Sequence, residues 1–161
     1  MKRLILFLLI CFSFLFGNMK ELLLIESKLY PKIVRLETSL KDKEQITFAV
    51  LYEESEKENA YEMAKLLRKQ GINVKIAPLN QGIPNADAYV LMAKKVCGNT
   101  LDNLLKKRKL IFGVYPQSIE YSIINVYIGV KIKPLINPYL LKKAKISLSP
   151  IIFKVAKIYE K

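Results

Sequence analysis

Two short polar stretches hold the side chains best suited to bind a ligand or to take part in a reaction. The first, Glu53 to Glu58 (EESEKE), carries four carboxylates within six residues. The second, Lys94 to Thr100 (KKVCGNT), combines two ammonium groups with a thiol. Both stretches follow predicted β-strands and precede predicted helices, and ligands bind at such positions in open α/β sheets.

The acidic stretch has a structural explanation that is stronger than a chemical one. Clustered carboxylates are typical of metal and acid–base sites, but Ser55 and Glu58 have the spacing of a helix capping box, and acidic residues stabilise a helix N-terminus. A dinucleotide would need a glycine-rich turn here, and the carboxylates would repel its phosphates. We therefore expect a helix start in this stretch, and we expect no metal and no other cofactor.

The lysine-containing stretch is better suited to a ligand. Two ammonium groups beside a helix N-terminus favour an anion and also the thiolate form of a nearby cysteine. The alternative is a solvated loop with an incidental thiol. The candidate anion or ligand loop consists of Lys94, Lys95, Cys97, Asn99 and Thr100.

The chain contains no histidine. This absence removes the commonest general base, the Ser–His and Cys–His nucleophile pairs, and most zinc sites. An enzyme would have to rely on carboxylates, lysines or tyrosines. We therefore expect a non-enzymatic protein with no catalytic residues.

The first residues have the layout of a secretory signal peptide. Met1-Lys2-Arg3 is basic, and Leu4 to Gly17 is apolar apart from Ser13. The apolar run is shorter than the roughly 20 residues that a membrane-spanning helix needs. We expect residues 1–17 to be a signal peptide and residues 18–161 to be one domain in a bacterial periplasm. Because Leu15 is bulky for a cleavage site, an uncleaved anchor is the alternative.

The net charge of +13 arises from 27 basic and 14 acidic residues. A charge of this size attracts nucleic acid, an anionic membrane surface or an acidic partner. Export disfavours nucleic acid, and the lysines are scattered, which indicates a solvated basic surface. Cys97 would be the single cysteine after cleavage, so no intramolecular disulfide can form. A homodimer through Cys97 stays open, although we expect function without it.

The remaining pattern predicts a single Rossmann-like α/β domain. Alternating strands and helices indicate right-handed crossovers and a mostly parallel sheet that helices cover on both faces. Two runs around Ile128-Gly129 predict an antiparallel hairpin near the C-terminus. A first helix with an apolar stripe (Leu22, Ile25, Leu29, Ile33 and Leu36) is kinked or split by Pro31. Helices are expected at 18–40, 55–69 and 100–107, and strands at 45–52, 72–77, 88–92, 110–115, 123–127 and 130–135.

Two closing helices are expected after the hairpin. Asn137 as N-cap and Pro138 at the first helical position predict a short helix over 139–145. Ser149-Pro150 repeats this arrangement. The last helix would pack an apolar stripe on the sheet and leave its lysines outside, or lie flat on anionic lipid. That stripe comprises Ile151, Ile152, Val155, Ile158 and Tyr159.

Residues 131–158 contain, in order, a strand that runs into "IN", the segment "LLKKA", the segment "KISLS" and an apolar stretch. This final third of the chain resembles the YfiR-like family of periplasmic proteins. "LYPKIVRLE" (residues 29–37) resembles the family's first helix, although the tryptophan and the cysteine pairs of family members are missing here. The resemblance implies a non-enzymatic regulator that represses an inner-membrane diguanylate cyclase, and so controls cyclic di-GMP. The matching C-terminal segments are the strand that runs into "IN" (131–137), "LLKKA" (140–144), "KISLS" (145–149) and the apolar stretch 151–158.

A second resemblance points to another class of function. The stretch from Ile46 to Ile76 is similar to one lobe of a transporter's periplasmic binding protein. Such proteins close two lobes on a ligand, and this chain is long enough for one. A single-lobe sensor of a small ligand is therefore the alternative to the regulator.

The signal-peptide interpretation predicts the mass of the protein in the cell envelope. Because the basic start and the short apolar run are typical of export, mass spectrometry of the envelope fraction should detect a chain that begins near Asn18. A chain that retains residues 1–17 would instead favour the uncleaved anchor.

Overall fold

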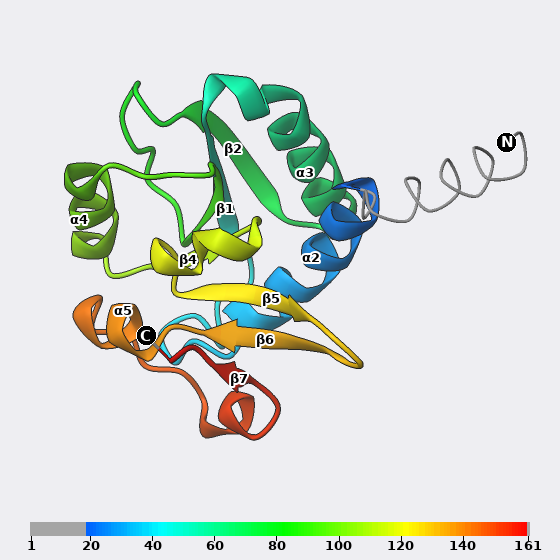
Figure 1. Cartoon of the computed structure of the whole chain (residues 1–161), viewed down its shortest axis with the longest axis vertical. Coiled ribbons are helices and arrows are strands. Elements are labelled where there is room, and N and C mark those ends of the chain that lie inside the picture. Colours follow the sequence, from blue (N-terminus) through cyan, green and yellow to red (C-terminus); the bar gives the residue numbers. More distant parts are fainter. Residues whose placement is uncertain (1–18, 161) are drawn as a thin grey trace, which may run out of the picture.

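The computed structural model describes residues 19–160, so the expected signal peptide (residues 1–17) lies outside the described residues. These residues form one α/β domain around a seven-stranded sheet (Figure 1). The strand order is β2-β1-β3-β4-β5-β6-β7. All neighbouring strands run parallel except β5 and β6, which form the expected antiparallel hairpin. Within the described range, no helix has both the length and the apolar character needed to cross a membrane.

The elements follow the predicted alternation of strands and helices. The α-helices are α2 (Met19–Val34), α3 (Lys57–Lys69), α4 (Gly98–Lys106) and α5 (Pro138–Lys143). The strands are β1 (Thr47–Tyr52), β2 (Asn73–Pro78), β3 (Ala88–Met92), β4 (Leu110–Gly113), β5 (Ile124–Ile128), β6 (Ile132–Ile136) and β7 (Lys157–Ile158). Three short 3₁₀ helices are η1 (Glu54–Glu56), η2 (Pro116–Glu120) and η3 (Pro150–Lys154).

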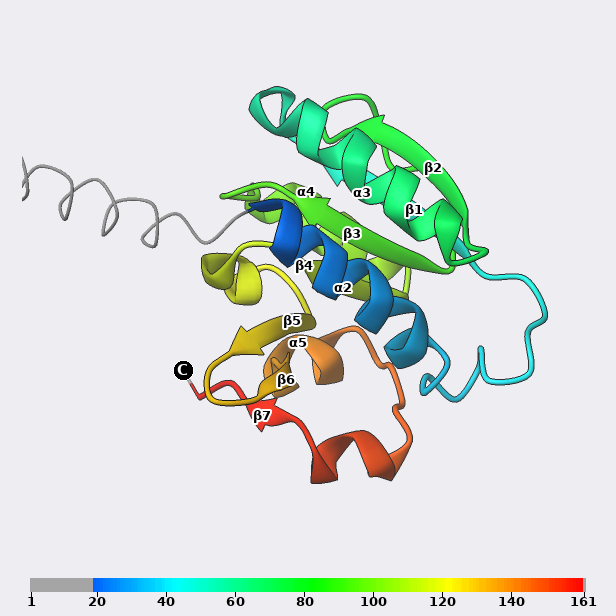
Figure 2. The same ribbon diagram turned by 90° about the vertical axis from the view of Figure 1, so that its right-hand side faces the viewer.

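Helices cover both faces of the sheet. The chain moves outward from β1 to β2 and then returns to β3, so right-handed crossovers place α3 and α4 on opposite faces. Figure 2 shows α2 and α3 together on one face, with α4 and α5 on the other. Strands β3 and β4 are buried throughout, which explains why they read as continuous apolar runs.

Helix α2 differs from the sequence-based expectation in its length and in its buried face. It continues through Pro31 as one helix, because the proline removes only a single hydrogen bond in the last turn, and it ends at Val34. Tyr30 packs its ring on Phe112 at 4.4 Å between centroids, and its hydroxyl donates to the carbonyl oxygen of Gly113 at 2.7 Å. The buried face therefore runs through Leu23, Glu26, Ser27 and Tyr30, and most of the predicted apolar stripe is only half-buried.

The prediction of a helix at the C-terminal end is wrong. The chain forms the short 3₁₀ helix η3 and then the strand β7, which pairs in parallel with β6. This pairing satisfies backbone groups that would otherwise lie at an exposed sheet edge. Only Ile152 is buried, whereas Ile151, Val155 and Ile158 are exposed, so the stripe does not pack on the sheet.

The β5–β6 hairpin ends in an exposed apolar tip. Ile128 pairs with Ile132 at the end of the ladder, and the turn contains Gly129, Val130 and Lys131. The side chains of Ile128, Val130 and Ile132 are all exposed. Figure 1 shows the turn projecting beyond the helices around it.

Candidate functional site

The strand order reverses between β1 and β3, and ligands bind at this point in many open α/β sheets. In this structure, residues that follow β1 and β3 contact one another at this position. The backbone N–H of Lys94, just after β3, donates to the carboxylate of Glu53, just after β1, at 3.3 Å. The Lys94 ammonium lies 3.7 Å from a carboxylate oxygen of Glu56.

Glu56 is the buried centre of this cluster. Its carboxylate accepts hydrogen bonds from the hydroxyl of Tyr115, which follows β4, and from the side-chain amide of Asn59 at 2.9 Å. Burial, and secondarily this carboxylate, raise the pKa of Tyr115 well above its usual value. The carboxyl ends of β1, β3 and β4 are thereby joined by charged and polar side chains.

The expected capping box does not form. Helix α3 begins at Lys57, and Glu56 occupies its N-cap position without a side-chain capping bond. The reason is that Ser55 lies within the 3₁₀ helix η1, which moves the N-cap of α3 one residue beyond it. Across residues 19–160, no group of three or more cysteine or carboxylate side chains is placed to hold a metal ion.

The residues of the predicted anion loop do not converge on one point. Lys94 pairs with Glu56, whereas the other members are largely exposed, and helix α4 begins at Gly98, two residues before the expected start. Cys97 is a free, exposed thiol at the N-cap. Lys95 and Asn99 are exposed, and Thr100 is half-buried within α4. The loop's role in anion binding stays a prediction.

The best-formed cavity near this loop is a pocket of about 510 Å³ on the α4 and α5 face of the sheet. We call it the tyrosine pocket. One wall is the start of α4, including Val96 and Gly98 of the predicted loop. The other walls come from η2, α5 and the residue after β7. Three tyrosine rings (Tyr121, Tyr139 and Tyr159) line it together with Leu101, Leu140, Asn137, Pro138, Glu120 and Lys143.

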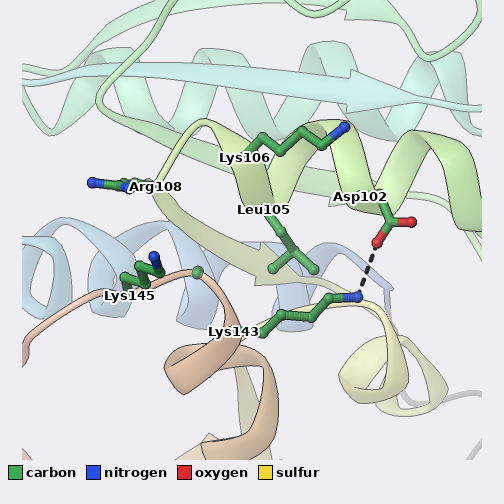
Figure 3. Close-up of a pocket in the computed structure, with 7 residues that line it drawn as sticks. Asp102, Leu105, Lys106, Arg108, Lys143 and Lys145 are labelled. Carbon is green, nitrogen blue, oxygen red and sulfur yellow. Dashed lines mark hydrogen bonds and ion pairs between the residues drawn. The ribbon is translucent and has the colours of Figure 1, made fainter.

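Two opposite charges border the tyrosine pocket. The Lys143 ammonium of α5 is held by Asp102 of α4 at 2.9 Å, and this hydrogen bond lowers the pKa of Asp102 (Figure 3). Glu120 makes no side-chain hydrogen bond or ion pair with any residue in the described range. A free carboxylate, a paired ammonium and three aromatic rings are therefore available to an organic ligand of mixed polarity.

A basic crevice of about 280 Å³ lies on the other side of the Asp102–Lys143 pair. Arg108 and Lys145 border it with left-handed backbones, at φ angles of 53° and 56°, just beyond the ends of α4 and α5. Basic residues at helix C-termini offset the helix dipole. In Figure 3 the side chains of Lys106 and Arg108 point away from each other, so we assign no ligand to the crevice.

Glu26 of α2 is a buried carboxyl group without a hydrogen-bond partner. Neither of its oxygens has one among residues 19–160, although the side chain is fully buried. Burial raises the pKa of Glu26 well above its usual value, and the nearby hydroxyl of Tyr30 offsets only part of this rise. Since the Tyr30 proton goes to Gly113, the carboxyl group is protonated more readily than an exposed one.

The sequence did not predict the tyrosine pocket, the contact between Glu56 and Tyr115, or the burial of Glu26. The pocket is assembled from segments far apart in the chain, and its aromatic residues show no spacing that marks them as neighbours. Of the residues that line the pocket, only Val96 and Gly98 lie inside the loop that the sequence predicted as a ligand site. The partnership of Glu56 with Tyr115 spans 59 residues and leaves no local pattern.

Comparisons with known proteins show a shared fold. No protein-family model and no curated protein sequence matches this chain. The structure is similar to that of an ABC domain in complex with L-Trp from Streptococcus pneumonia, with a TM-score of 0.57 and 13% identity over 80% of this chain. It is also similar to a conserved domain protein from Vibrio cholerae, with a TM-score of 0.55 and 12% identity over 83% of this chain.

These similarities support the α/β fold class that the sequence predicts. Both identities are too low to carry more than the fold. The aligned part spans 60% of the length of each of these two proteins.

The buried Glu26 carboxyl group predicts an unusual dependence of stability on pH. Its pKa is raised in the folded state relative to about 4.3 in the unfolded chain. The contribution of Glu26 to stability is therefore fully present below that value and is lost as the pH rises through the folded-state pKa. Replacement by methionine, Glu26→Met, should raise the free energy of unfolding at neutral pH by about 1–3 kcal/mol.

The measurement is the melting temperature from about pH 4 to pH 8, across the range where an ordinary carboxyl group ionises. The difference between Glu26→Met and the wild type should grow with pH. Glu62→Met, which removes an exposed carboxylate of α3, is the control and should show no such trend. A lower melting temperature for Glu26→Met at every pH would mean that the carboxyl group is stabilised by an interaction we have not identified.

Proposed function

We propose that this domain is a non-enzymatic binding module that holds a small organic ligand in the tyrosine pocket. The observation that carries the proposal is the pocket itself. Its volume of about 510 Å³ lies within the range of ordinary ligand sites, and its lining is mainly apolar and aromatic with a few polar groups. This proposal corresponds to the single-lobe sensor rather than to the regulator.

The chemistry of the lining favours a ligand that combines a flat apolar part with opposite charges. Tyrosine rings provide stacking surfaces, Glu120 suits an ammonium group, and Lys143 suits a carboxylate. A free aromatic amino acid has all three features. One protein of similar fold was solved with L-Trp, which adds support for this ligand class although the sequence identity is low.

The pocket predicts a specific loss of binding when a stacking ring is removed. Tyr139 is mostly exposed, so Tyr139→Ala should leave the fold intact while it raises the dissociation constant of the ligand about tenfold. The measurement is isothermal titration calorimetry with L-Trp and the other free amino acids on the purified protein. Glu120→Gln should weaken the binding of a ligand that carries an ammonium group and leave the binding of a simple carboxylate unchanged.

Tyr61→Ala is the matched control. Tyr61 is also an exposed tyrosine, but it lies on α3, on the opposite face of the sheet, and its loss should leave the affinity unchanged. The proposal fails if no compound of the panel binds, or if Tyr139→Ala binds as tightly as the wild type.

A second candidate function is the periplasmic regulator implied by the YfiR-like resemblance. What favours it is that the two resembling stretches lie side by side. The backbone N–H of Thr38, just beyond residues 29–37, donates to the carbonyl oxygen of Ser147 at 3.0 Å, and that of Ser149 donates to Leu36 at 2.7 Å. Two segments over a hundred residues apart thus form one structural unit, as a shared family fold would require.

The regulator hypothesis predicts a membrane partner and a change in cyclic di-GMP. The tagged full-length protein should retain an integral-membrane diguanylate cyclase from solubilised membranes, and its deletion should raise cyclic di-GMP in the cell. Tyr139→Ala provides the comparison between the two functions, because loss of the ligand alone should leave retention of the cyclase intact. If no cyclase is retained and cyclic di-GMP is unchanged, the regulator hypothesis is wrong.

A further inference from the structure

A mixed apolar and basic surface lies on the side of the sheet opposite the tyrosine pocket. It consists of the hairpin tip (Ile128, Val130 and Ile132) and the exposed residues of η3 and its end (Ile151, Phe153 and Val155), and we call it the hairpin–η3 surface. Ile132 of the hairpin tip and Val155 of the second part border one groove of about 470 Å³, whose third wall is α2. Exposed aliphatic side chains that gather in this way usually mark an interaction site.

The half-buried stripe of α2 extends this surface. Leu29 borders the same groove as Ile132, and Leu22 and Ile25 border a neighbouring groove of about 480 Å³ with Ile128. Because Ile128 and Ile132 are paired at the end of the hairpin, the two grooves lie next to each other there. The half-buried residues of the stripe therefore pack against the core and also border this surface.

Lysines surround the apolar residues, and no carboxylate lines the groove of about 470 Å³, whereas Glu21 lines the neighbouring groove. The lining of the first groove contains Lys32, Lys131, Lys133 and Lys154. None of the four forms an ion pair with a residue in the described range, whereas Lys43, Lys57, Lys65, Lys94 and Lys143 each pair with a carboxylate. The surface thus carries a local excess of positive charge that the protein does not compensate.

We propose that the hairpin–η3 surface binds the surface of an anionic phospholipid bilayer. Isoleucine, valine and phenylalanine side chains gain free energy at the boundary between head groups and acyl chains, and lysines around them attract anionic lipid. Nucleic acid would match the lysines and leave the aliphatic residues without a partner. A second copy would match the aliphatic residues, but a two-fold interface would bring like-charged lysines together.

A tryptophan at the hairpin tip tests the contact directly. The chain contains no tryptophan, so Val130→Trp introduces a single reporter at a fully exposed position. With the full-length protein, vesicles that contain phosphatidylglycerol should shift its fluorescence emission to shorter wavelengths, and pure phosphatidylcholine vesicles should not. Tyr61→Trp on α3 is the control, and its emission should stay unchanged with both kinds of vesicle.

A charge variant tests the electrostatic part. Replacing Lys131, Lys133 and Lys154 by glutamine should lower the partition coefficient on phosphatidylglycerol vesicles by about a hundredfold, or about fivefold per lysine. The same change at Lys65, Lys69 and Lys107, which lie elsewhere, should have a much smaller effect. Added salt should weaken wild-type binding because it screens exposed charges.

Four results would overturn the proposal. Vesicle binding with unchanged Val130→Trp emission would place the contact in another part of the chain. Equal binding by the wild type and the triple lysine variant would remove the electrostatic argument. If the protein bound membranes that contain protein but not pure lipid vesicles, the surface would be a protein-docking site. If the protein formed a dimer that Val130→Asp dissociates, the surface would be a self-association site.

Discussion

The domain depends on how polar groups are buried at the end of β4. Gly113 has no side chain, and a Cβ atom there would lie 2.5 Å from the side-chain oxygens of Asn125 and Ser122 and 2.6 Å from that of Ser118. These polar groups fill the space in place of a side chain, while the Gly113 carbonyl oxygen accepts the Tyr30 hydroxyl. Unpaired polar groups at this depth would cost free energy comparable to lost hydrogen bonds. Helix α2, η2 and β5 are therefore positioned by one small hydrogen-bonded cluster.

The position of the tyrosine pocket follows from this cluster. The Asn125 amide donates to the carbonyl oxygen of Tyr115 at 2.7 Å, which fixes the start of η2, and η2 supplies Glu120 and Tyr121 to the pocket. Asn137 then links η2 to α5, because its amide donates to Ile119 at 2.9 Å while its oxygen caps the helix at Leu140. The ion pair between Asp102 and Lys143 joins α5 to α4 and closes the remaining side. The η2 and α5 walls of the pocket are thus held by buried hydrogen bonds.

The parts of the fold that local chemistry determines were predictable from the sequence. The interior strands read as apolar runs because both of their faces are buried, and Asn137-Pro138 marks the start of α5 because its capping bond is local. The predicted capping box of Ser55 and Glu58 is absent because the 3₁₀ helix η1 includes Ser55 and places the N-cap of α3 at Glu56. The prediction of a last helix is wrong because apolar positions three and four apart also suit a short turn followed by a strand. Pairing with the otherwise free edge of β6 favours the strand. The pocket and the burial of Glu26 depend on which helices meet over which face, and a single helix pattern does not contain that information.

The C-terminal segment connects the two proposed surfaces. Residues of η3 lie at the hairpin–η3 surface, and Tyr159, directly after β7, lines the tyrosine pocket on the other face. The strand β7 is held by its pairing with β6, by the bond from Tyr159 to Ile136 at 2.8 Å, and by the Lys157 ammonium, which lies 3.9 Å from the centre of the Tyr127 ring. Few backbone bonds secure so short a strand, so its local stability is low compared with that of the interior strands. The same short segment thus supplies residues to both proposed surfaces.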